Sequence, residues 1–383
     1  MSRVVFISHY GSLYGANQSL LTFIEHSTMS KADMIVIVPE LGAFTDKLTE
    51  IGVQFIHQLF SPNIYRAHQG LFRRHWNGVK KLRWLFKLYI ILKKLKPVLI
   101  YSNSSILYYG FFLSKLLGIP HIWHLREFGA LDFKIYPDFG LNFQRYLLSK
   151  NTFNIAISRS ISKYYKLNEH NSKIIYNGVS TSAEFAETYK EKSFDKPLTF
   201  GVVGAIMPYK GQLQIVEAFH QFLVTKGVKE NTLYLIGLSV GDYVDEISAY
   251  IKNNNLEKNI IIIGHVKERA QIYRKFDVLI NGAKNEGFGR TTVEAMSYGI
   301  VPIGYNHSGI TETIAHKVNG ILFDSFDILP AILIHIDQNR AALQALQKNI
   351  KANFNPDFLT ENYCAKLDHI INKNIKSLIL QGT

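Results

Sequence analysis

The sequence predicts an α/β protein of two tandem domains, each a parallel sheet flanked by helices. Short apolar, β-branched runs alternate with segments of helix length, which is typical of a parallel sheet covered on both faces. A polar, charged stretch separates these runs into two series. A chain of 383 residues with 47% hydrophobic content is also long enough for two domains that each bury a core.

The first series predicts a domain over residues 1–180. Its opening strand precedes a glycine turn, Gly11–Gly15, and a helical pattern that carries Leu20, Leu21 and Ile24. The predicted strands are Val4–Ser8, Met34–Val38, Val98–Tyr101, His121–Leu125, Phe153–Ile157 and Lys173–Tyr176. The first domain therefore opens with a strand, a glycine loop and a helix.

The second series predicts a domain over residues 198–355. Residues 181–197, which precede it, are polar and charged and end at Pro197, so we expect a linker there. The predicted strands are Leu198–Val203, Leu233–Ile236, Ile260–Ile263, Val278–Ile280 and Val301–Gly304. Helical sequence in residues 356–383 predicts a closing helix that crosses back to the first domain.

The composition favours a reducing, cytoplasmic setting. Cys364 is the single cysteine, so no intramolecular disulfide can form, and no secretory leader pattern opens the chain. The most apolar windows, such as Ile106–Leu117, are interrupted by charge and are shorter than the roughly 18 residues that a spanning helix needs. We therefore expect no transmembrane helix.

The net charge of +13 is concentrated in the first half of the chain. The first 180 residues hold 22 Lys/Arg and 9 Asp/Glu, whereas the remainder holds 21 of each. No carboxylate occurs between Glu50 and Glu127, while ten basic residues crowd between Arg66 and Lys96. Such a field attracts phosphates or anionic lipid.

Residues 79–95 combine this basic charge with apolar residues at roughly helical spacing. The apolar residues are Trp84, Leu85, Phe86, Leu88, Ile91 and Leu92. One interpretation is an interfacial helix on anionic lipid, and the alternative is a core helix with a solvated basic face. The predicted acceptor or membrane contacts are Arg73, Arg74, Lys80, Lys81, Arg83 and Trp84.

The most informative segment is Asn285–Gly299, which follows a predicted strand, turns on Gly287 and Gly289 and enters a helix at about Arg290. Glycines permit close backbone approach, and the unpaired amides of a helix start bind anions. The segment also carries two carboxylates, Glu286 and Glu294, which suit a ligand rich in hydroxyls.

The simpler alternative for this segment is an i, i+4 ion pair between Arg290 and Glu294 on a solvated helix face. A cation near a helix N-terminus opposes the macrodipole, and Arg before Glu is the weaker order for such a pair. The ligand-binding interpretation is therefore preferred.

Glu286 and Glu294, within E-G-F-G-R-T-T-V-E-A-M, resemble the E-x7-E motif of glycosyltransferase family four, which comprises retaining enzymes of the GT-B type. The family's other features occur in order: the loop at Gly11–Gly15, His124, Asn177-Gly178-Val179, Gly204, and Lys210-Gly211. The resemblance implies a GT-B fold, with two Rossmann-like domains facing across a cleft and the donor between them.

The resemblance also implies roles for individual residues. Glu286, His124 and Lys210 are the predicted catalytic residues, with Glu286 at the transferred sugar and Lys210 at the diphosphate. The predicted donor-binding residues are Glu294, at the ribose, with Gly287, Phe288, Gly289, Arg290, Thr291, Gly15 and Gly204. Many members have an arginine where this chain has Ala205, and Arg290 is a candidate replacement.

No Asp-x-Asp motif occurs, so we expect no metal or other cofactor, and cations with helix amides to stabilise the leaving diphosphate. The implied function is retaining transfer of a hexose or N-acetylhexosamine from a nucleotide-sugar, UDP-linked by expectation. The expected acceptor is a sugar, lipid-linked, in O-antigen, capsule or related polysaccharide synthesis at the inner face of the cell membrane. The alternatives are a basic nucleic-acid-binding or other non-catalytic binding protein, and a GT-B phosphorylase or epimerase.

Overall fold

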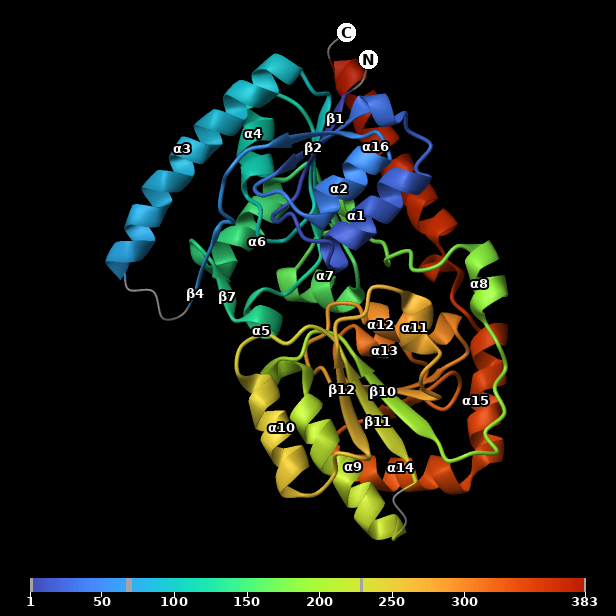
Figure 1. Cartoon of the computed structure of the whole chain (residues 1–383). Helices are drawn as coiled ribbons and strands as arrows, with labels where there is room; N and C mark the ends of the chain where they lie inside the picture. The colour runs from blue at the N-terminus through green and yellow to red at the C-terminus, as the bar shows by residue number, and fades with distance from the viewer. Residues whose placement is uncertain (1–2, 67–70, 228–229, 382–383) are drawn as a thin grey trace. The chain divides into compact units, whose positions relative to one another are not determined.

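The computed structural model describes residues 3–66, 71–227 and 230–381, with the backbone alone described at residues 66, 71–80, 379 and 381. The chain forms two compact units (Figure 1). Unit 1 comprises Met1–Gly178 and Asp357–Thr383, and unit 2 comprises Val179–Pro356.

Unit 1 is built on a seven-stranded sheet of order β3-β2-β1-β5-β6-β8-β9, in which every neighbouring pair is parallel. A separate antiparallel ribbon pairs β4 with β7. The strands are β1 (Val4–Ile7), β2 (Met34–Val38), β3 (Gln54–His57), β4 (Ile64–Arg66), β5 (Leu99–Ser102), β6 (His121–Leu125), β7 (Ile135–Pro137), β8 (Phe153–Ala156) and β9 (Ser172–Ile174).

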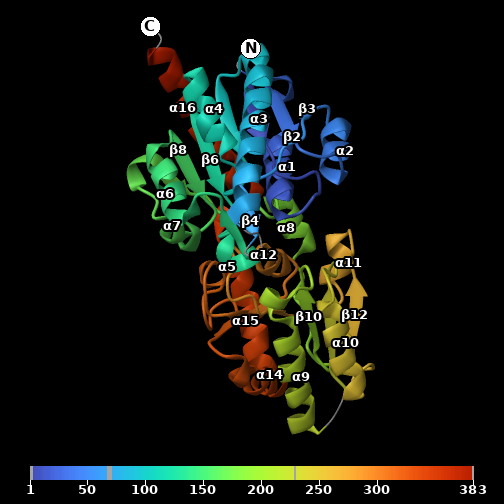
Figure 2. The ribbon, with the colours of Figure 1, turned by 90° about the vertical axis from the view of Figure 1, so that its left-hand side faces the viewer.

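Helices cover both faces of this sheet, which explains its continuous apolar strands. In β1, Val4 and Phe6 face a core shared with α1, α2 and α16, whereas Val5 and Ile7 face a core shared with α3 and α4. Helices α3 and α4 lie on the viewer's side of the sheet in Figure 2. The helices of unit 1 are α1 (Gly15–His26), α2 (Ala43–Glu50), α3 (Leu71–Leu95), α4 (Tyr109–Leu117), α5 (Ala130–Phe133), α6 (Gly140–Lys150), α7 (Arg159–Tyr165) and α16 (Thr360–Gln381).

Unit 2 is built on a six-stranded parallel sheet of order β12-β11-β10-β13-β14-β15. Its main core lies between the sheet and helices that include α9 and α14, and a smaller core on the other face includes α11 and α12. The strands are β10 (Thr199–Val203), β11 (Thr232–Ile236), β12 (Ile260–Gly264), β13 (Val278–Asn281), β14 (Val301–Tyr305) and β15 (Ile321–Phe323). The helices are α8 (Ser182–Thr188), α9 (Gln212–Lys226), α10 (Tyr243–Asn253), α11 (Arg269–Tyr273), α12 (Arg290–Ser297), α13 (Ile310–Thr313), α14 (Leu329–Gln338) and α15 (Arg340–Ala352).

Each strand predicted from the sequence overlaps an observed strand, whereas β3, β4, β7 and β15 were not predicted. These four are short, and β3 has exposed ends, so none shows a long apolar run. The stretch 181–197 differs from the expected linker, because it carries α8 and contributes the buried Tyr189 and Phe194 to the core of unit 2. Residues 357–383 cluster with unit 1, where α16 packs against α1.

Candidate functional site

The sheet of unit 2 changes direction between β10 and β13. The chain proceeds from β10 to β11 on one side and from β13 to β14 on the other, so the loops that leave β10 and β13 diverge. In doubly wound parallel sheets, ligands bind outside the carboxyl ends of the strands at such a point. The candidate site of unit 2 is therefore the edge where these two loops begin.

Lys210 and Glu286 meet at this edge. Lys210 ends a 3₁₀ turn (Pro208–Lys210) after β10, and Glu286 lies in the loop after β13. Their Nζ and Oε2 atoms are 2.6 Å apart, and about a quarter of each side chain is exposed. A residue predicted to bind a diphosphate and one predicted to bind a sugar thus form one partly accessible ion pair.

The glycine loop between Glu286 and α12 is shaped by close backbone packing. Gly289 is the N-cap of α12 at φ 88°, and a Cβ there would lie 2.8 Å from Cδ1 of Ile310. The Gly309 amide donates to the Glu286 carbonyl at 2.8 Å, and a Cβ on Gly309 would lie 2.5 Å from the Gly287 carbonyl oxygen. Gly289 requires glycine because side chains are disfavoured at positive φ, and Gly309 requires it because no space remains for a side chain.

Glu294, one turn into α12, is held by three side chains. Its Oε1 lies 2.9 Å from Nε of Arg290 and 3.4 Å from Nε of Arg269, and its Oε2 accepts from the Tyr273 hydroxyl at 2.7 Å. Burial opposes ionisation of this carboxyl, but the two guanidinium groups outweigh it and lower its pKa below the ordinary value. Glu294 is therefore an ionised carboxylate in a rigid setting.

The structure corrects the argument against an Arg290–Glu294 pair. The pair forms, and it is mostly buried rather than on a solvated face. Burial beside Arg269 and Tyr273 makes the carboxylate a strong partner, which outweighs the small unfavourable effects of pair order and helix dipole. Arg269 and Tyr273 are site residues that sequence reasoning missed.

The remaining predicted donor residues of unit 2 flank these groups. Phe288 is buried, and Thr291 is half-buried in the first turn of α12. Gly204 directly follows β10 at φ 140°, and a Cβ there would meet no neighbouring atom. Ala205 follows, with its carbonyl accepting from Nε2 of Gln212 at 2.9 Å.

In unit 1, the structure places His124 inside the sheet layer. The residue is fully buried on β6, its Nδ1 is hydrogen bonded to the Tyr101 hydroxyl, and its Nε2 has no partner among the described residues. Burial and the nearby Arg126 hold the pKa of His124 well below its usual value, so the ring is neutral. Gly15 is exposed at the start of α1.

Arg126 and Glu127 directly follow β6, and sequence reasoning passed over both. Arg126 is buried, and its guanidinium donates to Asn103 Oδ1 at 2.6 Å, Asn177 Oδ1 at 2.8 Å and the Tyr363 hydroxyl at 3.1 Å. The available signal was a pair of charged residues immediately after the buried strand HIWHL, because ligands bind at the carboxyl edge of parallel sheets.

The residues predicted to contact a membrane or acceptor differ in their surroundings. The side chains of Arg73, Arg74 and Lys80 lie outside the described residues. Lys81 contradicts the expectation, because it is buried and its Nζ lies 2.5 Å from Asp138 Oδ2. Arg83 is exposed.

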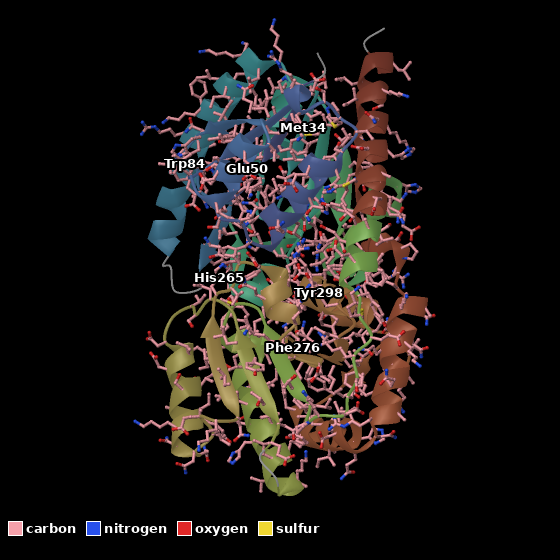
Figure 3. The ribbon with its side chains drawn as sticks, turned by 45° about the vertical axis from the view of Figure 1, so that its right-hand side comes forward. Met34, Glu50, Trp84, His265, Phe276 and Tyr298 are labelled. Carbon is pink, nitrogen blue, oxygen red and sulfur yellow. The ribbon has the colours of Figure 1, made fainter. Side chains whose placement is uncertain are left out.

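The apolar side of α3 also differs from the prediction. Leu88 and Leu92 are fully buried in a core of unit 1, and Trp84, which Figure 3 labels, is partly buried against it. A different row, Leu82, Phe86 and Ile90, is exposed at 66%, 63% and 40%. The core alternative is thus correct for most of the predicted face, and a second apolar row faces outward.

The described part of the chain has neither a membrane-spanning helix nor a cluster of metal-binding side chains. No helix in the described part of the chain is long and apolar enough to cross a bilayer. Likewise, the described side chains include no group of three or more His, Cys, Asp or Glu placed to hold a metal ion.

Residues 185–350 match the model of the family "Glycosyl transferases group 1". The capsular polysaccharide biosynthesis glycosyltransferase CapM of Staphylococcus aureus is 25% identical over 36% of this chain and 35% of its own length. An uncharacterized glycosyltransferase of Methanocaldococcus jannaschii is 30% identical over 56% of each chain. The chain therefore spans about a third of the first relative's length and slightly more than half of the second's.

A third relative aligns with most of the chain. The UDP-Gal:alpha-D-GlcNAc-diphosphoundecaprenol alpha-1,3-galactosyltransferase of Escherichia coli is 22% identical over 88% of each chain. Among solved structures, Anabaena HepE in complex with UDP and glucose superposes with a TM-score of 0.78 at 19% identity, covering 97% of this chain and all of that one. Residues 185–350 are therefore similar to the glycosyl transferases group 1 family, and the chain has the GT-B fold.

Proposed function

We propose that this chain is a retaining glycosyltransferase. It transfers a hexose or N-acetylhexosamine from a UDP-sugar to a lipid-linked sugar acceptor in the synthesis of O-antigen, capsule or a related surface polysaccharide, at the inner face of the cell membrane. The observation that carries this proposal is the Lys210–Glu286 pair at the switch point between β10 and β13, inside the family-matched residues.

The unit 2 site has the chemistry that a nucleotide-sugar needs. The Lys210 ammonium has three N–H donors, so it can bind diphosphate oxygens beside Glu286. The amides that begin α12 favour the same anion. Glu294, kept ionised by Arg269 and Arg290, is suited to accept a ribose hydroxyl. HepE, which has the same fold, is described in complexes with UDP and with UDP-glucose.

During transfer, negative charge grows on the departing diphosphate. We assign Lys210 and the α12 amides to its stabilisation, because preorganised donors directed at developing charge each contribute a few kcal/mol. Arg290 is engaged by Glu294, so its effect on the diphosphate would act through space while it also positions that carboxylate. The proposal that the anomeric configuration is retained rests on the resemblance of Glu286 and Glu294 to the E-x7-E motif.

The outward face of α3 supports a membrane-bound acceptor. Leu82, Phe86 and Ile90 form one row at four-residue spacing, and Arg83 and Lys87 are exposed on the same helix. An exposed apolar row flanked by cations binds anionic interfaces, where apolar burial and charge attraction add. We propose an anionic lipid surface as its partner.

The donor proposal is tested by a thermal-shift screen against UDP, GDP, ADP and CMP and their common sugar conjugates. A ligand that binds only the native state at 100 times its Kd stabilises by about 2.7 kcal/mol, so we expect higher melting temperatures with UDP conjugates. Glu294→Gln and Lys210→Met should lose most of this ligand-induced shift. Glu257→Ala, an exposed carboxylate at the opposite edge of the same sheet, should keep it.

Turnover is then followed by UDP release and by NMR of the new anomeric centre, with N-acetylglucosaminyl diphosphate on an undecyl chain as the acceptor probe. No shift with any nucleotide, together with salt-sensitive oligonucleotide binding, would favour the binding-protein alternative. Release of sugar phosphate, or an epimerised nucleotide-sugar, would identify a phosphorylase or an epimerase.

The membrane proposal is tested by flotation with liposomes of neutral or 30% anionic lipid. We expect binding only to the anionic vesicles, weakened by salt and by Phe86→Asp. Val224→Asp, at a comparably exposed apolar residue on α9, is the matched control. Equal binding to neutral vesicles, or no effect of Phe86→Asp, would contradict it.

A further inference from the structure

Glu127 lies at the carboxyl edge of the unit 1 sheet, one strand away from the point where the strand order reverses. Unit 1 changes direction at β1, whose neighbours are β2 and β5, and the loops after β5 and β6 meet at the same carboxyl edge. Ser104 and Ser105 follow β5, and Glu127 follows β6. No role for Glu127 emerged from the sequence motifs.

The carboxyl is held through one oxygen only. Its Oε1 accepts from the Ser104 hydroxyl and from the Ser105 amide at 2.9 Å, while the Ser105 and Tyr165 hydroxyls donate to the Glu127 carbonyl at 2.9 and 3.0 Å. Its Oε2 receives no hydrogen bond from any described residue, and it is not among the fully enclosed polar atoms that lack a partner. The arrangement fixes the carboxyl and leaves one oxygen open to a ligand.

Among the described residues, no Lys or Arg forms an ion pair with this carboxyl. The adjacent Arg126 directs its three donor groups to Asn103, Asn177 and Tyr363 instead. Burial, with a contribution from Asp132, raises the pKa of Glu127 to about 7, against the opposing effects of its hydrogen bonds and of Arg126.

The hydroxyls of Tyr10 and Tyr165 are the other titratable groups near this carboxyl, and burial raises their pKa values, so both stay neutral. A buried carboxyl without an ion-pair partner destabilises the fold, and such groups cluster at functional sites.

We propose that Glu127 binds the acceptor hydroxyl and accepts its proton, an assignment that rests on the glycosyltransferase function proposed above. The hydroxyl proton moves to Oε2 of Glu127 as the acceptor oxygen bonds to the anomeric carbon. The bond between that carbon and the diphosphate oxygen breaks, and its electron pair leaves with the nucleoside diphosphate. The proton then passes from Glu127 to solvent, and the carboxylate is restored.

The test compares wild type, Glu127→Gln and Glu169→Gln, the last an exposed carboxylate of the same unit. Two quantities are measured on the full chain: UDP affinity by calorimetry, and UDP release from UDP-sugars to water or to N-acetylglucosaminyl diphosphate on an undecyl chain. We expect Glu127→Gln to keep UDP affinity within twofold and to lose UDP release by 10²- to 10⁴-fold, the usual effect of removing a general base. In wild type, kcat/KM should rise with pH through about 7, and this rise should be absent in the variant.

UDP release by Glu127→Gln within threefold of wild type would overturn the assignment. So would a parallel loss of UDP affinity or a lower melting temperature, because either would indicate a structural role. A wild-type protein that neither binds UDP nor releases it from any UDP-sugar would contradict the proposed function itself, which the Glu127→Gln comparison presupposes.

Discussion

Replacing Glu127 with glutamine is expected to stabilise unit 1 at pH 8. The folded protein holds the Glu127 pKa at about 7, against an ordinary value of 4.5, because the carboxyl is buried without an ion-pair partner. A pKa difference of 1 corresponds to about 1.4 kcal/mol, so the ionised Glu127 carboxylate lowers the free energy of unfolding by about 3 kcal/mol. Glutamine has no charge, and its carbonyl oxygen still accepts from Ser104 and Ser105.

The pH dependence of this effect has a definite sign. The folded state binds the Glu127 proton more tightly than the unfolded chain does. The resulting stabilisation of the folded state is therefore fully present below about pH 4.5. This contribution is lost as the pH rises through about 7. The advantage of Glu127→Gln should therefore be greatest at pH 8 and fall below about 1 kcal/mol at pH 5.

The assay is thermal unfolding of wild type and variant at pH 5, 6, 7 and 8. For a unit of this size, about 3 kcal/mol corresponds to a rise of roughly 6–12 °C in Tm at pH 8. Glu169→Gln should change Tm little at any pH, because its carboxylate is exposed. A lower Tm for Glu127→Gln at pH 8, or a difference that does not shrink toward pH 5, would refute the reasoning.

Two further predictions concern stability. Gly289→Ala should lower the thermal stability of unit 2 by more than Gly264→Ala does. Both residues have positive φ, where a side chain costs about 1–2 kcal/mol. Only the alanine at position 289 would also place its Cβ 2.8 Å from Ile310. Equal losses of stability in the two variants would show that Ile310 can move away from the new Cβ without cost. Lys81→Met should lower the free energy of unfolding of unit 1 by about 3–5 kcal/mol, because Asp138 loses its buried ion-pair partner. The double variant Lys81→Met/Asp138→Asn should recover part of this stability. Lys87→Met, on the exposed side of the same helix, should change Tm little. A Lys81→Met protein as stable as Lys87→Met would contradict the importance of the pair.

Much of the fold could be predicted from local sequence. Strands such as Met34–Val38 and His121–Leu125 appear with their predicted bounds, because a strand buried on both faces is rich in apolar residues along its whole length. The start of α12 at Arg290 was also predicted, because the glycines at 287 and 289 mark a turn directly before the helical pattern. Edge strands such as Gln54–His57 were missed, because partial exposure removes the continuous apolar run.

The candidate site was predicted in its members but not in its contacts. Lys210 and Glu286 were both identified, yet 76 positions separate them, and only the adjacency of β10 and β13 brings their side chains to 2.6 Å. Arg269 reaches Glu294 from another helix, which no spacing along the chain indicates.

The sequence by itself determined the two α/β series, the basic first half and the glycine and carboxylate motif, because periodicity, composition and backbone preference are local properties. Only the tertiary structure decided which charges are paired and which apolar residues face outward. Lys81 is buried against Asp138, and Phe86 is exposed. The Arg126 guanidinium contacts amide and hydroxyl oxygens, while Glu127 has no ion-pair partner among the described residues. Burial and partner choice depend on which distant segments pack together, and charge energetics depend on both.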